Sequence, residues 1–244
     1  MTIAERIYKH YEDNQEPPRE HLGPSQIGRP CDREIWLNFR WAMKPKFDGR
    51  MLRLFKRGHR EEDFTIADLE AIGIKVTNRQ RKLEIASHFK GSIDGEADGM
   101  LLECKTVKLK NFGKVPPEHI AQVQVYMHAG TYKKCLYVAV CKDDDRIYTE
   151  VIEYNRDIAL KYIERGIRII NSARMPEPMV GASPTWYECK WCAYYGFCWK
   201  REPITERNCR TCAHSTPGAA HTWTCAKGRN AFCEEYYMHP DLSC

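Results

Sequence analysis

The chain has 244 residues, of which 43% are hydrophobic and 29% charged, and this composition indicates one soluble globular domain or one domain with a small appendage. No apolar run approaches the roughly 20 residues of a membrane-spanning helix, and the charged N-terminus does not resemble a secretory signal. We therefore expect a cytoplasmic protein with no membrane partner. The net charge of +5 permits a polyanionic partner such as a nucleic acid but does not demand one.

Hydrophobic periodicity and turn residues, taken in chain order, predict a chain in which helices and strands are mixed. A short helix and a proline-containing loop are expected in residues 1–24, and further helices at 31–42, 48–72, 116–129 and 156–173. Strands are expected at 74–76, 83–89, 91–95, 100–106, 135–141 and 146–154. This order predicts an α/β fold with a mixed core.

The segment from Asp94 to Lys105 carries the strongest chemical pattern, an aspartate followed after eight residues by Glu103-Cys104-Lys105. Side chains alternate along a strand, so Glu103 and Lys105 share one face and Cys104 points to the other. Two glycines between them suit a turn, which lets Asp94 lie on the neighbouring strand and face Glu103. Two carboxylates and a lysine suit a divalent cation and a water to be activated, the parts that phosphodiester hydrolysis needs.

Plainer interpretations of these residues stay open. Asp94 could be only a turn residue, and Glu103 with Lys105 could be a surface ion pair on an edge strand. Glu96 and Asp98 fall in the predicted hairpin turn, where we expect them to be solvated rather than to bind metal.

Two flanking helices add polar pairs at helical spacing. His59 and Glu62 are three residues apart and share one face of the upstream helix. Gln122 and Tyr126 are one turn apart on the downstream helix. Any of the four could be an ordinary solvated position when taken alone, but their order around the acidic pattern strengthens the functional interpretation.

These motifs together resemble those of the PD-(D/E)XK nuclease superfamily and, within it, the RecB-like exonucleases. The matching elements are Gly58-His59 with Glu62, then Asp94, then Glu103-Cys104-Lys105, then Gln122-x-x-x-Tyr126. The resemblance spans about residues 50–130. It implies a restriction-endonuclease-like fold, in which a mixed central β-sheet is flanked by helices.

The resemblance also implies a catalytic metal site. Asp94 and Glu103 would hold Mg²⁺ or Mn²⁺ together with the backbone carbonyl of Cys104. Either His59 or Glu62 would complete the site, with a slight preference for His59.

Three further catalytic roles follow from the same resemblance. Lys105 would orient or deprotonate the attacking water, helped by a pKa that the nearby metal lowers. Gln122 and Tyr126 would position Lys105 or the DNA backbone.

Twelve cysteines are many for a cytosolic chain, and clustered cysteines there bind metal more often than they form disulfides. Cys189, Cys192 and Cys198 form a C-x2-C-x5-C motif, and Cys31 could supply a fourth thiolate. This arrangement resembles the iron–sulfur RecB-like nucleases of the CRISPR-associated and AddB types. The resemblance implies a 4Fe–4S cluster that closes a nuclease domain of residues 1–200; a structural zinc or no metal is the alternative.

Residues 201–244 are predicted to form a small cysteine-rich tail that binds zinc through a knuckle-like site. Cys209 and Cys212 form a C-x2-C pair. The other candidate ligands are Cys225, Cys233 and Cys244, with His214, His221 and His239 behind them. A tail without metal stays open. The remaining cysteines, Cys104, Cys135 and Cys141, lie in predicted strands and are expected to be core residues.

We therefore expect a metal-dependent deoxyribonuclease, specifically an exonuclease acting in recombination, repair or replication of phage DNA in a bacterial host cell. Its partner would be DNA that is single-stranded or at a duplex end, and any helicase or recombination protein would be a separate chain. A structure-specific endonuclease and a non-catalytic nucleic-acid-binding subunit are the alternatives.

Overall fold

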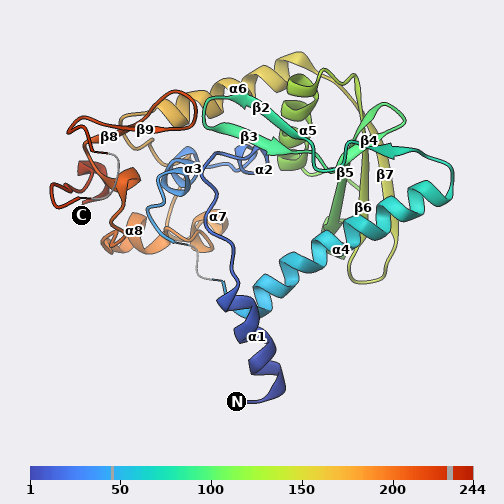
Figure 1. Ribbon diagram of the computed structural model, residues 1–244, viewed down its shortest axis with the longest axis horizontal. Helices are drawn as coiled ribbons and strands as arrows, with labels where there is room; N and C mark the ends of the chain where they lie inside the picture. The colour runs from blue at the N-terminus through green and yellow to red at the C-terminus, as the bar shows by residue number, and fades with distance from the viewer. Residues whose placement is uncertain (45–46, 230–232, 244) are drawn as a thin grey trace.

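The computed structural model describes residues 1–44, 47–229 and 233–243 (Figure 1). Its α-helices are α1 (Ile3–Asp13), α2 (Pro24–Ile27), α3 (Asp32–Phe39), α4 (Gly49–Ala71), α5 (Pro117–Gly130), α6 (Arg156–Asn171), α7 (Tyr187–Lys190) and α8 (Tyr195–Lys200). Its strands are β1 (Val76–Thr77), β2 (Lys82–Ala86), β3 (Phe89–Ser92), β4 (Gly95–Ala97), β5 (Met100–Val107), β6 (Lys134–Cys141), β7 (Ile147–Glu153), β8 (Ser215–Pro217) and β9 (Trp223–Cys225). Among the helices of these described segments, none is long and apolar enough to cross a membrane.

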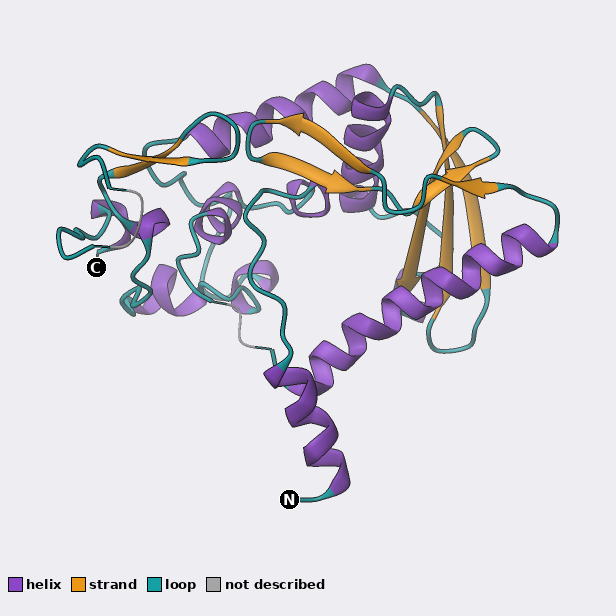
Figure 2. Ribbon diagram, viewed as in Figure 1, coloured by secondary structure: helices purple, strands orange, loops and turns teal. Residues whose placement is uncertain are grey.

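The central sheet has five strands in the order β1-β4-β5-β6-β7. The β5–β6 pair is parallel and is connected through α5, whereas the other neighbouring pairs are antiparallel. Helix α5 packs on one face of the sheet, α4 packs on the other, and α6 lies against α5 (Figure 2). The structure therefore confirms the predicted mixed α/β core flanked by helices.

Alternation along β5 explains why both faces of this strand are covered. Leu101 packs with the core on the α5 side, and Leu102 packs with Ile66 and Leu69 of α4 on the other side. Each buried aliphatic side chain contributes about 1.5–3 kcal/mol to folding. The strand is thus held firmly on both sides up to Glu103, where polar residues begin.

Helix α4 begins and ends as its sequence predicts. The side chain of Asp48 accepts a hydrogen bond from the backbone N–H of Met51 at 2.7 Å and caps the N-terminus. Gly73 follows the last turn with a φ of +88°, a conformation that favours glycine. The 23-residue helix is therefore a rigid support for the side chains that it carries.

The segment between α4 and β5 departs from the prediction. Residues 83–89 do not form one strand, because β2 ends at Ala86 and the chain turns back at His88 into β3. The strand expected at 91–95 also ends early, and Asp94 lies in a bend directly before β4. His88 adopts a left-handed backbone (φ 59°), and its predicted strand conformation was therefore wrong.

The C-terminal tail packs against the N-terminal helices. Ile204 and Leu242 are buried in the same hydrophobic cluster as Leu22, Trp36 and Phe39. Strands β8 and β9 form a small hairpin that was not predicted. The boundary near residue 200 between nuclease region and tail stays a prediction.

Candidate active site

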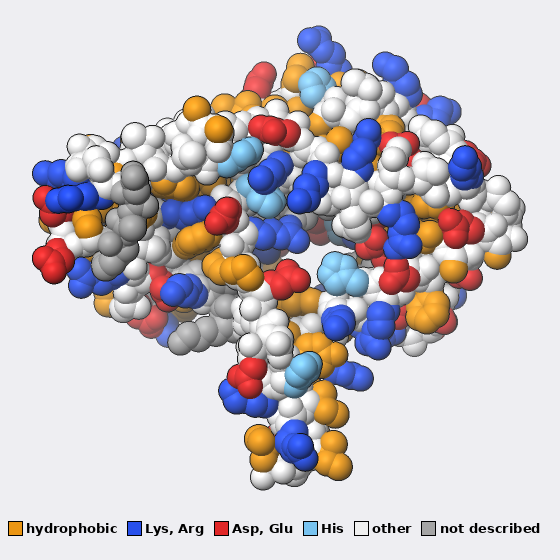
Figure 3. Space-filling view, viewed as in Figure 1, with side chains coloured by type: hydrophobic (Ala, Val, Ile, Leu, Met, Phe, Trp, Pro, Cys, Tyr) orange, Lys and Arg blue, Asp and Glu red, His pale blue; other side chains and the backbone are white. Residues whose placement is uncertain are grey.

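A cavity of about 910 Å³ opens between α4, α5, β5 and the β2–β3 hairpin. Residues 17–21 of the N-terminal segment also line it. Figure 3 shows the hollow near the centre of this face, with lysine, arginine and histidine side chains around it. Seven of the predicted site residues line the cavity: His59, Glu62, Asp94, Cys104, Lys105, Gln122 and Tyr126.

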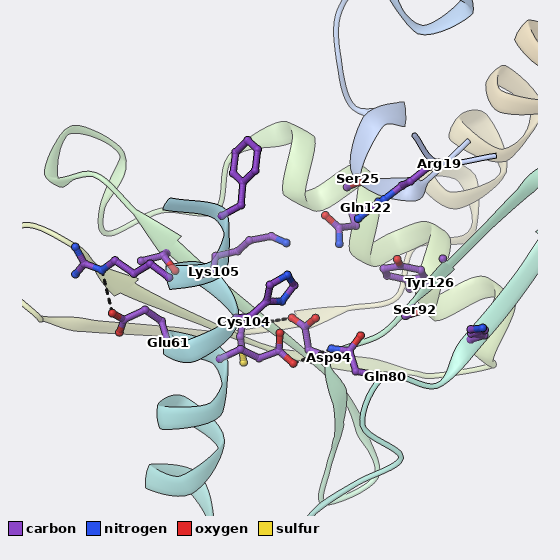
Figure 4. A pocket seen from close by; sticks show the side chains of 18 of the residues that line it. Arg19, Ser25, Glu61, Gln80, Ser92, Asp94, Cys104, Lys105, Gln122 and Tyr126 are labelled. Carbon is purple, nitrogen blue, oxygen red and sulfur yellow. Dashed lines mark hydrogen bonds and ion pairs between the residues drawn. The ribbon is translucent and has the colours of Figure 1, made fainter. Parts of the chain in front are cut away.

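The β4–β5 hairpin brings Asp94 beside the middle of β5. Gly95 pairs with Leu102, so Asp94 directly before it lies opposite Glu103. The backbone N–H of Cys104 donates a hydrogen bond to Asp94 Oδ2 at 2.8 Å (Figure 4). The predicted juxtaposition of Asp94 with the Glu103 strand is confirmed by this geometry.

Glu103 lies beneath the cavity and is 1% exposed. Its Oε1 accepts hydrogen bonds from Lys105 Nζ and from Gln122 Nε2, the latter at 2.7 Å. Its Oε2 is buried and has no hydrogen-bond partner among the described residues. Leaving a buried carboxylate oxygen unpaired costs free energy, so this atom fits a group that the protein itself does not supply, such as a cation.

Burial and mutual charge shift the pKa values of Glu103, Asp94 and Lys105. Burial raises the pKa of Glu103 to about 7, although Lys105 opposes the rise. Burial also raises the pKa of Asp94, again against Lys105. Burial alone would lower the pKa of Lys105, but the charges of Glu103 and Asp94 outweigh it and raise that pKa. The protein's own groups therefore keep Lys105 charged, and the expected lowering of its pKa would have to come from a bound cation.

Both candidates for the additional metal ligand, His59 and Glu62, face the cavity from α4. Burial and the charge of Asp94 raise the pKa of Glu62, so the two carboxyl groups lie close enough to interact. Glu62 Oε1 accepts a hydrogen bond from Gln80 Nε2 at 2.8 Å. Gln80 was not predicted, and no sequence signal identifies it, because a tight turn with a φ of 55° brings it to α4.

Gln122 and Tyr126 occupy the wall formed by α5, and their expected roles toward Lys105 or the DNA backbone stay predictions. Gln122 Nε2 donates a hydrogen bond to the Glu103 carboxylate, which also accepts from Lys105 Nζ. Tyr126 is 4% exposed, and burial raises the pKa of its hydroxyl. A Cβ atom on Gly91 would lie 2.4 Å from this hydroxyl oxygen, so the close packing of β3 on α5 requires glycine there.

Glu96 and Asp98, which were expected in a solvated turn, behave differently from each other. Glu96 lies in β4, where it accepts a hydrogen bond from the Tyr132 hydroxyl at 2.5 Å and pairs with Arg81 at 3.2 Å. The expectation was therefore wrong for Glu96, because a separate strand, β4, begins at Gly95 and the turn is limited to residues 98–99. Asp98 is exposed in the turn, as expected, and accepts a hydrogen bond from the Lys75 N–H.

Basic and hydroxyl side chains form the wall opposite the carboxylates, and the sequence motifs did not identify them. Arg19 and Ser25 come from the N-terminal segment, and Figure 4 shows them beside Gln122. Lys82 and Lys90 come from the β2–β3 hairpin. Hydroxyls, lysines and arginines are the groups that contact phosphates in protein–DNA complexes.

The segment between α1 and α2, residues 14–23, lines one side of the cavity and is held at both ends. Before its start, the N–H of Gly49 in α4 donates to Oε1 of Glu12 in α1 at 2.8 Å. At its end, the backbone carbonyl of Leu22 accepts from the N–H of Lys90 at 3.2 Å, and the Leu22 N–H donates to the carbonyl of His88 at 2.8 Å. This strap therefore connects α1, which is held on α4, with the β2–β3 hairpin and forms one wall of the cavity.

The four residues of the first cysteine set come from three places in the chain. Cys31 precedes α3, Cys189 lies in α7, Cys198 lies in α8, and Cys192 lies between these two helices. All four thiols are free and line one cavity of about 90 Å³: Cys31, Cys189, Cys192 and Cys198. Burial raises the pKa of Cys192 to about 11, so without a cation this thiol is neutral at physiological pH.

The second cysteine set also gathers in the tail. Burial raises the pKa of Cys209, and the neighbouring thiols of Cys212, Cys225 and Cys233 add to this rise. Cys244 lies outside the described residues. His221 and His239 use both ring nitrogens for protein contacts, His221 with the His88 N–H and Glu84, His239 with Ala173 and the Asp241 N–H. These two histidines are therefore not available as ligands.

No group of three or more His, Cys, Asp or Glu side chains in the described part of the chain is arranged as the ligand set of a metal ion. This holds for the carboxylates beside β5 and for both cysteine sets. Two features nevertheless match the donor chemistry of bound metals, the unpaired Glu103 Oε2 and the four free thiols around one small cavity.

Comparison with known proteins gives structural neighbours but no relative by sequence. No protein-family model and no curated protein sequence matches the chain. SSO0001 superposes with a TM-score of 0.50 at 17% identity, covering 82% of this chain and 97% of that one. An alkaline exonuclease from Laribacter hongkongensis gives 0.49 at 18% identity, covering 66% and 90%. The likeness to SSO0001 shows a shared fold, and the lower score of the exonuclease carries no argument about function.

Proposed function

We propose that this protein is a metal-dependent deoxyribonuclease that degrades DNA from its ends. The observation that carries the proposal is the Glu103 Oε2 atom, which is buried beside Asp94 and Lys105 with no hydrogen-bond partner in the described part of the chain, under a cavity with a basic wall. A protein that only binds nucleic acid has no use for such a buried, incompletely paired carboxylate, since leaving the atom unpaired destabilises the fold.

The donor set fits Mg²⁺ or Mn²⁺, both of which prefer oxygen ligands. Asp94, Glu103 and the Cys104 carbonyl would hold the cation, and His59 or Glu62 would complete the site. Such a cation stabilises negative charge on a phosphate and lowers the pKa of a coordinated water.

The chain's own groups supply the remaining parts of the reaction. Lys105 Nζ donates to Glu103 and faces the cavity, where its positive charge can orient a water and stabilise the pentavalent phosphate. Gln122 fixes the Glu103 carboxylate from α5. The basic wall around Lys82 and Lys90 holds the backbone of the strand that is cut.

The strap of residues 14–23 favours an exonuclease over an endonuclease. Glu12 directly before the strap is bonded to Gly49, and Leu22 at its end is bonded to Lys90, so the cavity wall continues from α4 to the β2–β3 hairpin. A strand that is threaded past a continuous wall of this kind enters by its end, and closed circular DNA has no end to offer. The proposed substrate is therefore single-stranded DNA or a frayed duplex end, supplied by a separate helicase or recombination protein during phage DNA processing in the bacterial cytoplasm.

We further propose a 4Fe–4S cluster at Cys31, Cys189, Cys192 and Cys198. The four thiols surround a cavity instead of converging on one point, and this matches a cluster, in which each thiolate binds a different iron, better than a single zinc ion. The cluster would join the beginning and the end of the nuclease region. For the tail we propose zinc at Cys209, Cys212, Cys225 and Cys233.

The test is the degradation of end-labelled linear DNA and of closed circular DNA by anaerobically purified protein with Mg²⁺ or Mn²⁺. We expect linear DNA to be shortened from its ends and circular DNA to stay intact. Asp94→Asn and Lys105→Ala should lower the rate by about 10³-fold. Asp98→Asn, an exposed position in the same hairpin, is the matched control and should retain wild-type activity.

Two results would contradict the proposal. Cutting of the circular DNA would show an endonuclease. Binding of DNA by the folded, metal-loaded protein without any cleavage would show a binding subunit.

A further inference from the structure

A pair of large hydrophobic side chains stands exposed on the wall of the cavity. Among the described residues, Leu54 and Phe55 of α4 are the exposed large hydrophobic side chains that line it, at 40% and 47% exposure. A hydrophobic side chain left in water on a cavity wall gains nothing for folding. Its position instead favours contact with an apolar part of the ligand.

Phe55 lies on the same stripe of α4 as the predicted metal-site residues. His59 follows it by four residues and Glu62 by seven, so the three side chains stand in a row on one face of the helix. One helical turn advances about 5.4 Å. The ring of Phe55 therefore stands one turn of α4 before His59, in line with the predicted metal-site residues of this helix.

The ring of Phe55 is also braced in place. Phe47 packs against it edge to face, with ring centroids 4.9 Å apart and an interplanar angle of 86°. Phe47 is itself 37% exposed, so the pair is not part of the hydrophobic core. An aromatic ring that packs against a second ring while about half of its surface stays exposed is fixed in orientation and available to a ligand.

Gly58 leaves room in front of this row. It lies in the middle of α4 and lines the cavity, and a Cβ atom there would meet nothing within 4 Å. Glycine in a helix interior costs roughly 0.5–1 kcal/mol relative to alanine, and no protein contact requires it at this position. The free space over Gly58 lies between Phe55 and Glu62, where a flat group could approach the helix.

Resting on the proposed nuclease function, we propose that Phe55 is a positioning residue that stacks on a base of the single strand, next to the nucleotide whose phosphate is cut. The basic side chains of the opposite wall bind the phosphates, and the ring of Phe55 stacks on the face of the base. Every base has such a face, so the contact tolerates any sequence. It fixes the strand so that one phosphate at a time lies over Asp94 and Glu103.

The test combines Phe55 variants with oligonucleotides that lack one base. Steady-state hydrolysis is measured with single-stranded oligonucleotides carrying a tetrahydrofuran abasic analogue at successive positions around the scissile phosphate. On intact DNA, Phe55→Ala should raise KM roughly tenfold and leave kcat within about twofold, while Phe55→Trp should restore the wild-type KM. At one abasic position, the KM of the wild type should rise by the same factor. The KM of Phe55→Ala should not rise further at that position.

Two further variants serve as controls. Phe64 lies on the same helix at 67% exposure and does not line the cavity, so Phe64→Ala should match the wild type. Phe55→Leu keeps the apolar volume without an aromatic face, and it should show most of the KM effect even if Phe55→Ala folds poorly.

The outcomes separate this inference from the proposed function. If the wild type cuts DNA but Phe55→Ala has an unchanged KM, the stacking role is wrong and the nuclease stands. The stacking role is equally wrong if Phe55→Ala raises KM over the wild-type value by the same factor at every abasic position. If the wild type cuts no DNA, the proposed function fails, and binding of the same oligonucleotides in EDTA then decides the stacking role by the same comparison.

Discussion

The cavity beside β5 and the junction between the tail and the N-terminal helices both bury charged side chains, but the two regions satisfy those charges differently. At the junction, Arg210 is 6% exposed, donates to the carbonyls of Phe39 and Glu20, and lies 3.8 Å above the Trp41 ring. At the cavity, Glu103 is buried with one oxygen that has no hydrogen-bond partner among the described residues. The first arrangement needs no ligand and stabilises the fold, whereas the second destabilises the fold and would become favourable on binding of the proposed cation.

The largest effect on stability is expected when the Arg210 side chain is removed, which tests whether the junction depends on it. Arg210→Ala removes the stacked guanidinium and takes a donor from the buried carbonyl of Phe39 and from the carbonyl of Glu20, so the free energy of unfolding should fall by about 3 kcal/mol. Arg207, which is exposed and lies 4.8 Å from the Tyr236 ring, is the matched control, and Arg207→Ala should change stability by at most about 0.5 kcal/mol. Urea unfolding followed by tryptophan fluorescence measures both. Equal, small losses would show that the junction does not depend on the buried guanidinium.

A second prediction concerns Glu103, which should destabilise the fold when it is ionised, whereas Arg210 stabilises it. Its folded-state pKa is about 7, above the ordinary value of 4.5, so the folded protein binds a proton that the unfolded chain has already released in this range. The contribution of Glu103 to stability is therefore fully present below pH 4.5 and is lost as the pH rises through 7. Across this window the contribution should change by roughly 3 kcal/mol.

The measurement is the unfolding free energy of metal-free wild type minus that of Glu103→Gln, at intervals from pH 4.5 to 8. The unfolding free energy of the wild type by itself also depends on pH through its histidines. Burial lowers the pKa of His21 and His119 to about 4, so these two residues destabilise the fold as the pH falls below 6.5. They are present in both proteins and cancel in the difference. We expect the difference to fall with rising pH. A flat difference would mean that Glu103 ionises at its ordinary pKa and is not strained.

The sequence was sufficient for the parts of the site that depend on local structure. Asp94, Glu103 and Lys105 belong to one hairpin with short connections, so strand alternation and two glycines were enough to bring them together. The buried strand β6 and helices α4 and α5 were also predicted, because their hydrophobic periodicity is long and regular. These features need no knowledge of distant segments.

The parts that failed depend on contacts between distant residues. The turn at His88 contains no glycine, and its left-handed backbone is held by Gly218 and His221, more than 120 residues away. Gln80 reaches Glu62, and Arg19 reaches the cavity, only because of how the chain packs. Periodicity within a segment carries no information about such contacts, so the cavity wall opposite the carboxylates could not be predicted.

The smallest expected effect tests whether the two regions act on each other. His221 Nδ1 accepts a hydrogen bond from the His88 N–H at 2.8 Å, and its Nε2 lies 3.3 Å from Glu84 Oε1. Both contacts hold the β2–β3 hairpin, which carries Lys82 and Lys90 into the cavity wall. The tail therefore supports the basic wall of the cavity through the β2–β3 hairpin, and these contacts do not involve Asp94 or Glu103.

Loss of these contacts through His221→Ala should free the hairpin turn and cost about 1 kcal/mol of DNA binding, a five-fold rise in Kd. The hydrolysis rate at saturating DNA should not change, because Asp94, Glu103 and Lys105 keep their own supports in β4, β5 and α5. Hydrogen exchange should quicken in residues 82–92, and His214→Ala, in the same tail but beside Tyr237, serves as the control. If exchange quickens while Kd stays at the wild-type value, the wall does not bind the strand, and the tail is only a structural appendage.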